Sequence, residues 1–134
     1  MYKVFFNQKP LILTNEIQEF SDTEPFIFIK YSNSSQIIKA LKSTKNSKVY
    51  LYHKNFDKLW KTFTKQFPVI EAAGGLVERT DNKLLFIFRN NKWDLPKGGV
   101  EKNELIIEAA KREVTEETGV ADLIVQNQIS ETYH

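Results

Sequence analysis

The chain has 134 residues and a mass of 15.7 kDa, enough for one ordinary domain or two very small ones. It contains no cysteine and only two histidines, which excludes disulfide scaffolds, thiolate zinc sites, cysteine nucleophiles and histidine-rich metal sites. No apolar run reaches the roughly 18 residues of a membrane span, and the first ten residues lack a signal-peptide pattern. The composition therefore predicts a soluble, cytoplasmic globular protein.

The net charge of +2 conceals two halves of opposite sign. Residues 1–68 carry 11 lysines, no arginine and 5 acids, a net charge of +6. Residues 69–134 carry 5 lysines, 3 arginines and 12 acids, a net charge of −4. Such asymmetry indicates two units with different partners. The acidic half could hold cations. The basic half either attracts polyphosphate or nucleic acid or merely keeps the protein soluble, and the sequence leaves both alternatives open.

The first 68 residues predict a small α/β domain with the order β-β-β-α-β-α. A polar run at 32–35 offers an N-cap to a helix at 36–42. A second helix is predicted by apolar residues at i, i+3, i+4 and i+7 from Phe56, and Pro68 ends it. The strands, rich in β-branched and aromatic residues, are expected at 2–6, 11–13, 26–31 and 49–53, with a hairpin joining the first two.

A second domain is expected directly after Pro68, because no flexible linker separates the two halves. Its apolar first strand contains paired glycines, which indicate close backbone approach. A later helix is expected to have Asn103 as its N-cap and to run to Thr118, where Gly119 stops it. The other expected elements are strands at 69–78 and 84–89 joined by a turn at 80–83, an irregular loop through 93–99, and a last strand at 123–129.

The helix expected at 104–118 carries acids among its apolar residues. At about 100° per residue, the apolar residues cover an arc of about 200°, and Glu113, Glu116 and Glu117 project inside it. Burying three uncompensated carboxylates costs more than one helix recovers, so something must neutralise them. The apolar residues of this arc are Leu105, Ile106, Ile107, Ala109, Ala110 and Val114.

The spacing of the three acids indicates what neutralises them. Separations of i,i+3 and i,i+4 allow all three carboxylates to converge on one point. Oxygen ligands without cysteine or histidine favour Mg²⁺ or Mn²⁺. Arg112 can reach Glu108 or Glu116 and orient a carboxylate. The alternative is a solvated charge cluster at the end of a helix.

The same segment carries a motif that is defined by residue type and spacing. The Nudix box is matched at every defining position by Gly98-x5-Glu104-x7-Arg112-Glu113-Val114-Thr115-Glu116-Glu117-Thr118-Gly119-Val120. Leu95-Pro96-Lys97-Gly98-Gly99 likewise resembles the loop that opens this box. The chain therefore resembles the Nudix hydrolase family.

The resemblance implies an α/β/α sandwich, with the box as a loop–helix–loop. It also implies hydrolysis of a nucleoside diphosphate linked to another moiety, assisted by Mg²⁺ or Mn²⁺. By similarity, Glu116 and Glu117 are expected to bind the metal, Glu113 to be a ligand or a base for water, and Arg112 to orient Glu113. A backbone carbonyl of Lys97 or Gly98 would complete the metal shell, and Glu104 is a candidate for an outer or additional metal.

Substrate contacts are less specified. Arg79, Arg89 and Lys97 are candidate phosphate partners, although each is also an ordinary solvated surface cation. Trp93 could stack on a base, or it packs in the core or against a loop. The stretch from Trp93 to Gly98 resembles family members that act on dinucleoside polyphosphates or related polyphosphates. A nucleotide-type small molecule is therefore the expected substrate.

The domain organisation departs from the family pattern. We expect a small basic α/β domain at 1–68 and the N-terminal part of a Nudix domain, including the box helix, at 69–134. A Nudix domain normally continues with further strands and a second helix, so we expect either a truncated piece, which alone need not be active, or a fold completed by another chain. The alternative function is a nucleotide-sensing module without turnover. Loss of a box acid would favour it, and none is lost.

Overall fold

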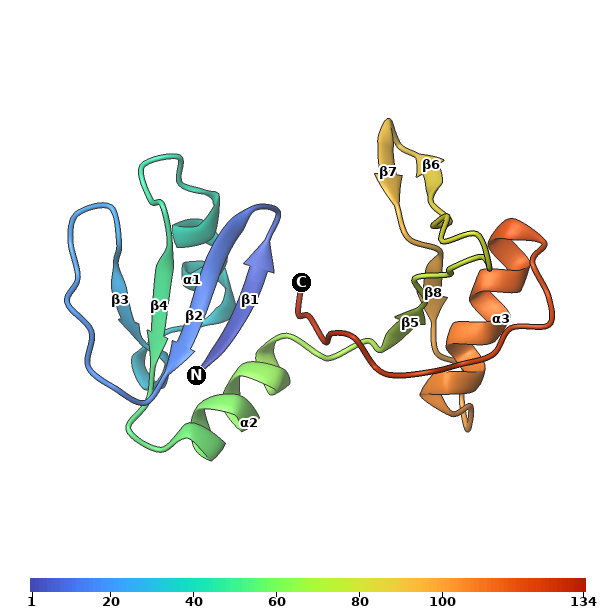
Figure 1. Cartoon of the computed structure of the whole chain (residues 1–134). Coiled ribbons are helices and arrows are strands. Elements are labelled where there is room, and N and C mark those ends of the chain that lie inside the picture. The colour runs from blue at the N-terminus through green and yellow to red at the C-terminus, as the bar shows by residue number, and fades with distance from the viewer. The chain divides into compact units, whose positions relative to one another are not determined.

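The computed structural model describes all 134 residues, which form two compact units. The first unit comprises Met1–Val69 together with Ile129–His134, and the second comprises Ile70–Gln128. Both combine strands with helices (Figure 1), so the expected mixed α/β class is confirmed. None of the helices is long and apolar enough to cross a membrane.

The first unit has the predicted order of elements. Its hairpin turns at Asn7, which adopts the left-handed conformation with a φ of 56°. The elements are β1 (Tyr2–Phe6), β2 (Lys9–Thr14), β3 (Phe26–Phe28), a 3₁₀ turn (Ile29–Tyr31), α1 (Ser34–Lys42), β4 (Val49–Tyr52) and α2 (Phe56–Gln66).

The first unit folds around one four-stranded sheet with the order β1-β2-β4-β3. β1 pairs antiparallel with β2, whereas β4 runs parallel to both β2 and β3. Alternate residues of β2 and β4 form one core with α1 and α2, so both helices cover the same face of the sheet. This core contains Leu11, Leu13, Ile29, Ile37, Leu41, Val49, Leu51, Leu59 and Phe63.

Two local details differ from the sequence prediction in this unit. The strand expected at 26–31 ends at Phe28, because Ile29–Tyr31 turn into a 3₁₀ helix that carries Ile29 into the core. Helix α1 begins at Ser34, two residues earlier than expected. Asn33 accepts a hydrogen bond from the Gln36 N–H at 2.9 Å, and the Gln36 side chain accepts one from Asn33 N–H at 2.9 Å. This capping box fixes the start of α1.

The last six residues of the chain return to the first unit. Tyr133 forms a parallel bridge with Val4, and its carbonyl oxygen accepts a hydrogen bond from Phe5 N–H at 2.9 Å. The Tyr133 ring stacks on Tyr2 and meets Trp60 edge to face. The sequence interpretation placed these residues in the second domain, and in the structure they add to the edge formed by β1.

The second unit is built from short strands and one long helix. Two two-stranded antiparallel sheets pair β5 with β8 and β6 with β7. The turn between β6 and β7 consists of Asn90 and Asn91, whose φ values of 51° and 59° match a two-residue type I′ hairpin. The elements are β5 (Ala72–Gly74), β6 (Ile87–Arg89), β7 (Lys92–Asp94), β8 (Lys97–Gly99) and α3 (Ile106–Thr118).

The sequence prediction was less accurate for this unit. The long strands expected at 69–78 and 84–89 are reduced to β5 and β6, and the loop expected through 93–99 contains β7 and β8. Asn103 does not cap the helix, because it adopts a φ of 62° in a turn before α3. Residues 123–129 form no strand, since no neighbouring strand pairs with them.

Candidate functional site

Helix α3 packs through small residues against the β5–β8 sheet. Ala109 and Val114 are its buried residues, and the facing strands contribute alanine and glycine. The apolar arc predicted for this helix is therefore wrong in part, because Leu105, Ile106 and Ile107 at its start are exposed. The acidic side chains of α3 face β8, and the candidate site is built there.

Arg112 is the centre of the acidic cluster. Its Nε and Nη2 donate to the two carboxylate oxygens of Glu104 at 2.8 and 3.0 Å. Its Nη1 donates to Glu113 at 2.7 Å and to Glu116 at 3.1 Å. Its Nη2 also donates to the backbone carbonyl of Gly99 at 2.8 Å. A guanidinium has five N–H donors, so Arg112 commits all of them to this cluster. Paired bonds of this type fix both partners in one orientation.

Glu117 belongs to a second set of contacts. Its carboxylate accepts a hydrogen bond from Arg89 Nη1 at 2.7 Å and another from the Lys97 backbone N–H at 2.9 Å. Arg89 lies at the end of β6 and Lys97 at the start of β8, so Glu117 connects both sheets to α3. The three acids predicted to converge are thus held in two groups, Glu113 and Glu116 by Arg112 and Glu117 by Arg89.

Gly98 lets the helix approach the strand closely. A Cβ at this position would overlap the carboxylate of Glu113, so a side chain would displace Glu113. A Cβ at Gly99 would meet nothing within 4 Å. Of the two glycines, only Gly98 leaves no room for a Cβ, whereas Gly99 contributes its carbonyl to Arg112.

The ion pairs determine the ionisation of the cluster. Hydrogen bonds from Arg112, joined by one from the Glu101 backbone N–H, lower the pKa of Glu104 to about 2. The same acids raise the pKa of Arg112, with Glu104 the largest cause. The Lys97 ammonium lowers the pKa of Asp94, to which it is hydrogen-bonded. Glu104, Asp94 and Arg112 are therefore charged at neutral pH.

The chemistry of the donors fits a hard cation. Glu113, Glu116 and Glu117 offer carboxylate oxygens only, the ligands that Mg²⁺ and Mn²⁺ prefer. One carboxylate oxygen of Glu113 and one of Glu116 receive no hydrogen bond. The structure does not gather three acids into a group that could hold a metal ion, and Glu117 is hydrogen-bonded to Arg89 whereas the other two are bonded to Arg112.

The family of this site follows from its sequence pattern and a comparison with known proteins. The NUDIX domain family matches residues 69–133, which include α3 and every acid of the cluster. Residues 69–133 of this chain therefore correspond to a Nudix domain.

Two curated relatives share sequence with the chain. It is 29% identical to the mRNA-decapping protein g5R of African swine fever virus, over 86% of this chain and 54% of that protein. It is 36% identical to an RNA pyrophosphohydrolase of Bartonella henselae, over 33% of this chain and 25% of that protein. The chain thus spans about half the length of the viral relative and a quarter of the bacterial one. No solved structure matches it significantly.

The structure brings some of the predicted substrate residues to the Nudix box. Arg89 and Lys97 contact Glu117 directly. Trp93 is 73% exposed and faces Phe88 across the β6–β7 hairpin, so it is not a core residue. Arg79 pairs with Asp81 in the preceding turn and forms no hydrogen bond or ion pair with the box.

Sequence reasoning missed two contributors to the site. Asp94 lies 3.9 Å from Arg89, which pairs with Glu117, and Asp94 is also hydrogen-bonded to the Lys97 ammonium, so it connects these two cations. The carbonyl of Gly99 accepts a hydrogen bond from the remaining N–H of Arg112. The position of Asp94 in the sequence between the cations Arg89 and Lys97 could have indicated its role. Nothing in the residue type of Gly99 indicates a carbonyl contact.

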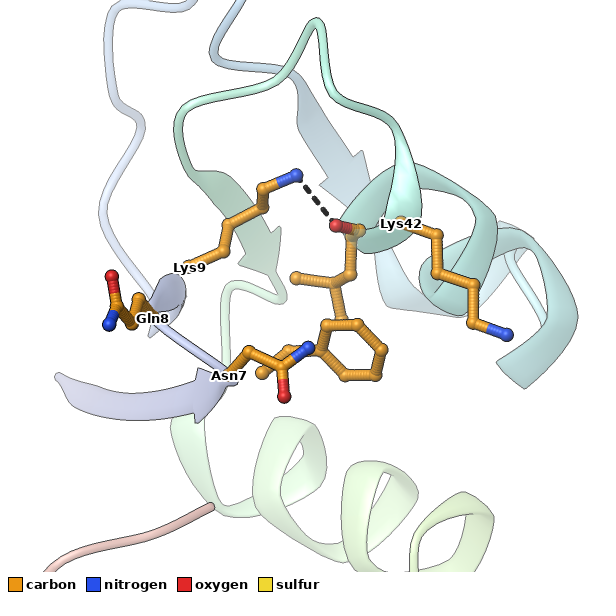
Figure 2. A pocket seen from close by; sticks show the side chains of 6 residues that line it. Asn7, Gln8, Lys9 and Lys42 are labelled. Atoms are coloured by element: carbon orange, nitrogen blue, oxygen red, sulfur yellow. Dashed lines mark hydrogen bonds between the residues drawn. The ribbon is translucent and has the colours of Figure 1, made fainter. Parts of the chain in front are cut away.

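Two hollows lie in the first unit, and none of the site residues lines either of them. One of about 440 Å³ is lined by the β1–β2 turn and the end of α1 (Figure 2). Its Lys9 ammonium is already bound to the carbonyl oxygens of Leu41 and Ser43, where it caps α1. A second hollow of about 390 Å³ lies beside β1 and residues 131–133. Neither contains an acid cluster, so the candidate site is the Nudix box.

Proposed function

We propose that the protein hydrolyses a pyrophosphate bond in a nucleoside diphosphate linked to another moiety, using Mg²⁺ or Mn²⁺. The observation that carries this proposal is the Arg112 network, which holds Glu104, Glu113 and Glu116 of a complete Nudix box in fixed positions. A site built to fix carboxylates in this way suits a reaction in which charge develops on phosphate oxygens.

Glu113, Glu116 and Glu117 would hold the cation, with Glu104 or the backbone carbonyl of Lys97 or Gly98 as further oxygen donors. When bound, such a cation neutralises charge on the pyrophosphate and lowers the pKa of coordinated water. Arg112 keeps Glu113 against Gly98, with one carboxylate oxygen free to bind the cation or accept a proton from water.

Arg89, Lys97 and Trp93 would bind the substrate. The Arg89 guanidinium is paired with Glu117 and the Lys97 ammonium with Asp94, and both cations would bind phosphate oxygens of the substrate. Asp94 sets their orientation. The exposed Trp93 ring on the hairpin offers a surface on which a base can stack. Glu117 would then bind the cation instead of Arg89, and Arg89 would bind the substrate.

Among the linked moieties, RNA has the strongest support. Both relatives are named for action on RNA, one as a decapping protein and one as a pyrophosphohydrolase. The similarity to the decapping protein covers 86% of the chain and therefore extends into the first unit. We therefore place a 5′-capped or 5′-triphosphorylated RNA before a dinucleoside polyphosphate as the substrate.

The test is product release from a panel containing capped RNA, 5′-triphosphate RNA, dinucleoside polyphosphates and ADP-sugars, with Mg²⁺ or Mn²⁺. Glu117→Gln should lower the rate at least a hundredfold while the fold is retained. Glu108→Gln is the matched control, because Glu108 lies on α3 but only accepts a 3.4 Å hydrogen bond from the Leu105 N–H. Equal rates for Glu117→Gln and the wild type would contradict the proposal. Nucleotide binding without any product would instead indicate the sensing module.

A further inference from the structure

The acids of the first unit are concentrated away from its helices. Of the five acids in residues 1–68, four lie between β2 and β3, namely Glu16, Glu19, Asp22 and Glu24. The fifth, Asp57, is the only acid in the two helices. The two helices carry five lysines against that one acid, and three of the five lie on α2.

Helix α2 carries a regular row of lysines, which we call the lysine stripe: Lys58, Lys61 and Lys65. Their i, i+3, i+7 spacing places them within about 60° of one another on the helix wheel. Leu59 and Phe63 lie on the opposite side and are buried in the core. All three lysines of the stripe are exposed. The stripe therefore points away from the sheet.

The lysine stripe is not neutralised by the protein itself. No ion pair joins Lys58, Lys61 or Lys65 to a carboxylate, and Asp57 pairs with none of them. In the second unit, by contrast, all three arginines are ion-paired. Like charges at i,i+3 and i,i+4 repel, so the isolated helix gains nothing from this arrangement. An anionic partner with repeated charges would relieve the repulsion.

We propose that the lysine stripe binds the phosphate backbone of single-stranded RNA. This proposal rests on the proposed function, because the strand would be the body of an RNA whose 5′ end is hydrolysed. Three ammonium groups spread over seven residues of helix span about 10 Å, which is long enough to contact successive phosphates of one strand. Lysine is a point charge without a planar fork, so the contact carries no base sequence preference.

A lipid surface fits the same helix less well. Membrane-surface helices insert an apolar face, whereas the apolar face of α2 is already buried in the core of the first unit. The open face of the sheet is a weaker RNA site than α2. It carries the aromatic cluster of Phe26, Phe28 and Tyr52, but the acidic loop between β2 and β3 adjoins it through Phe20.

The experiment measures binding of the full chain to a 20-nucleotide unstructured RNA with a 5′-hydroxyl end, in the presence of a chelator. This RNA has no pyrophosphate, so its binding does not depend on the Nudix box. The test variant replaces Lys58, Lys61 and Lys65 by Gln, which keeps helix propensity and most of the side-chain stem. The control variant replaces Lys30, Lys45 and Lys83 by Gln, three exposed lysines that form no ion pair with an acid.

The stripe variant should bind at least tenfold more weakly at about 100 mM salt, and the plot of log K against log salt should flatten by about 2. The control variant should keep the wild-type slope. Equal losses in both variants, an unchanged slope in the stripe variant, or tighter binding to anionic vesicles than to RNA would overturn the proposal. Hydrolysis of a small dinucleoside polyphosphate by the stripe variant is measured separately, so failure of the proposed function is distinguished from failure of the RNA site.

Discussion

Gly98 and Gly99 are neighbours with different requirements for space. A Cβ at Gly98 would overlap the carboxylate of Glu113, which Arg112 holds in place, whereas a Cβ at Gly99 would meet nothing within 4 Å. We therefore expect Gly98→Ala to displace Glu113 and to lower pyrophosphate hydrolysis by about a hundredfold, since misplacing a reacting group by about 1 Å costs that much. The measurement is kcat with Mg²⁺ at saturating substrate.

Gly99→Ala is the control for that substitution. It preserves the carbonyl that Arg112 binds, so its rate should stay within about twofold of wild type. The unfolding midpoints of both variants should lie close to wild type, because the Glu113 side chain can move aside. A Gly98→Ala enzyme with wild-type kcat would show that the position of Glu113 does not matter for the reaction.

Glu104 provides a prediction about pH. Its pKa in the folded protein is about 2, below the ordinary value of 4.5, because Arg112 donates two hydrogen bonds to its carboxylate. A lowered folded pKa means that the ion pair stabilises the protein above about pH 4.5 and loses this effect as the pH falls towards 2. A carboxyl-carbon NMR titration should place the Glu104 midpoint near 2.

Arg112→Lys tests the cause of that shift. Lysine keeps the charge but lacks the planar fork, so the Glu104 midpoint should rise towards its ordinary value. Lys111→Gln removes a neighbouring exposed cation and should leave the midpoint where it was. A Glu104 midpoint that stays near 2 in the Arg112→Lys protein would mean that a cause other than the guanidinium lowers it.

At the scale of the element, α3 ends at a residue that only glycine suits well. Gly119 has a φ of 76° and its N–H bonds to the Thr115 carbonyl at 2.8 Å, which closes the last turn. Gly119→Ala should lower the free energy of opening of α3 by about 1–2 kcal/mol, because alanine is strained in the left-handed region. Hydrogen exchange of the α3 amides measures this energy. Gly119→Asn should cost less, and equal costs for the two would contradict the argument.

The elements also show what could be predicted from the sequence alone. Helix α2 and the β1–β2 hairpin were predicted correctly because the apolar period and the turn residues agree there with the packing. The short strands β7 and β8 were missed, since three residues are too few to show alternation. The strand expected at 123–129 was wrong because strands need a partner, and a partner is not visible in local sequence.

Some contacts of the candidate site could also be predicted from the sequence, and others could not. The i,i+4 contact between Arg112 and Glu116 is within reach of spacing rules, and the structure contains it. The pairing of Arg112 with Glu104 spans eight residues and depends on the turn at Asn103, which was expected to be a helix cap. Arg89 and Asp94 are brought to Glu117 by a hairpin, so only the fold could place them there.

At the scale of the whole molecule, the two units differ in the size of their cores. Nine large side chains form the core of the first unit, whereas the buried apolar residues of the second are Ala73, Pro96, Ala109 and Val114. Fewer buried contacts mean a lower free energy of local opening. We therefore expect the amides of α3 to exchange at least tenfold faster than those of β4 in metal-free protein.

The same hydrogen-exchange measurement can be repeated with metal present. Because the three carboxylates proposed to hold the cation, those of Glu113, Glu116 and Glu117, lie on α3, millimolar Mn²⁺ should slow exchange in α3 and leave β4 unchanged. Glu117→Gln should abolish the slowing. Uniform slowing in both units, or none in either, would contradict a metal site on this helix.

The return of the last six residues to β1 has a consequence for limited proteolysis. Residues 70–128 are inserted in the sequence between two segments of the first unit. The chain therefore joins the two units twice, once at Val69 and once at Ile129. A protease that cuts once near Pro68 leaves the second attachment intact, and its strength then depends on the Tyr133 contacts with Tyr2, Phe5 and Trp60. The nicked halves should therefore co-elute, and loss of the Tyr133 ring should let them separate.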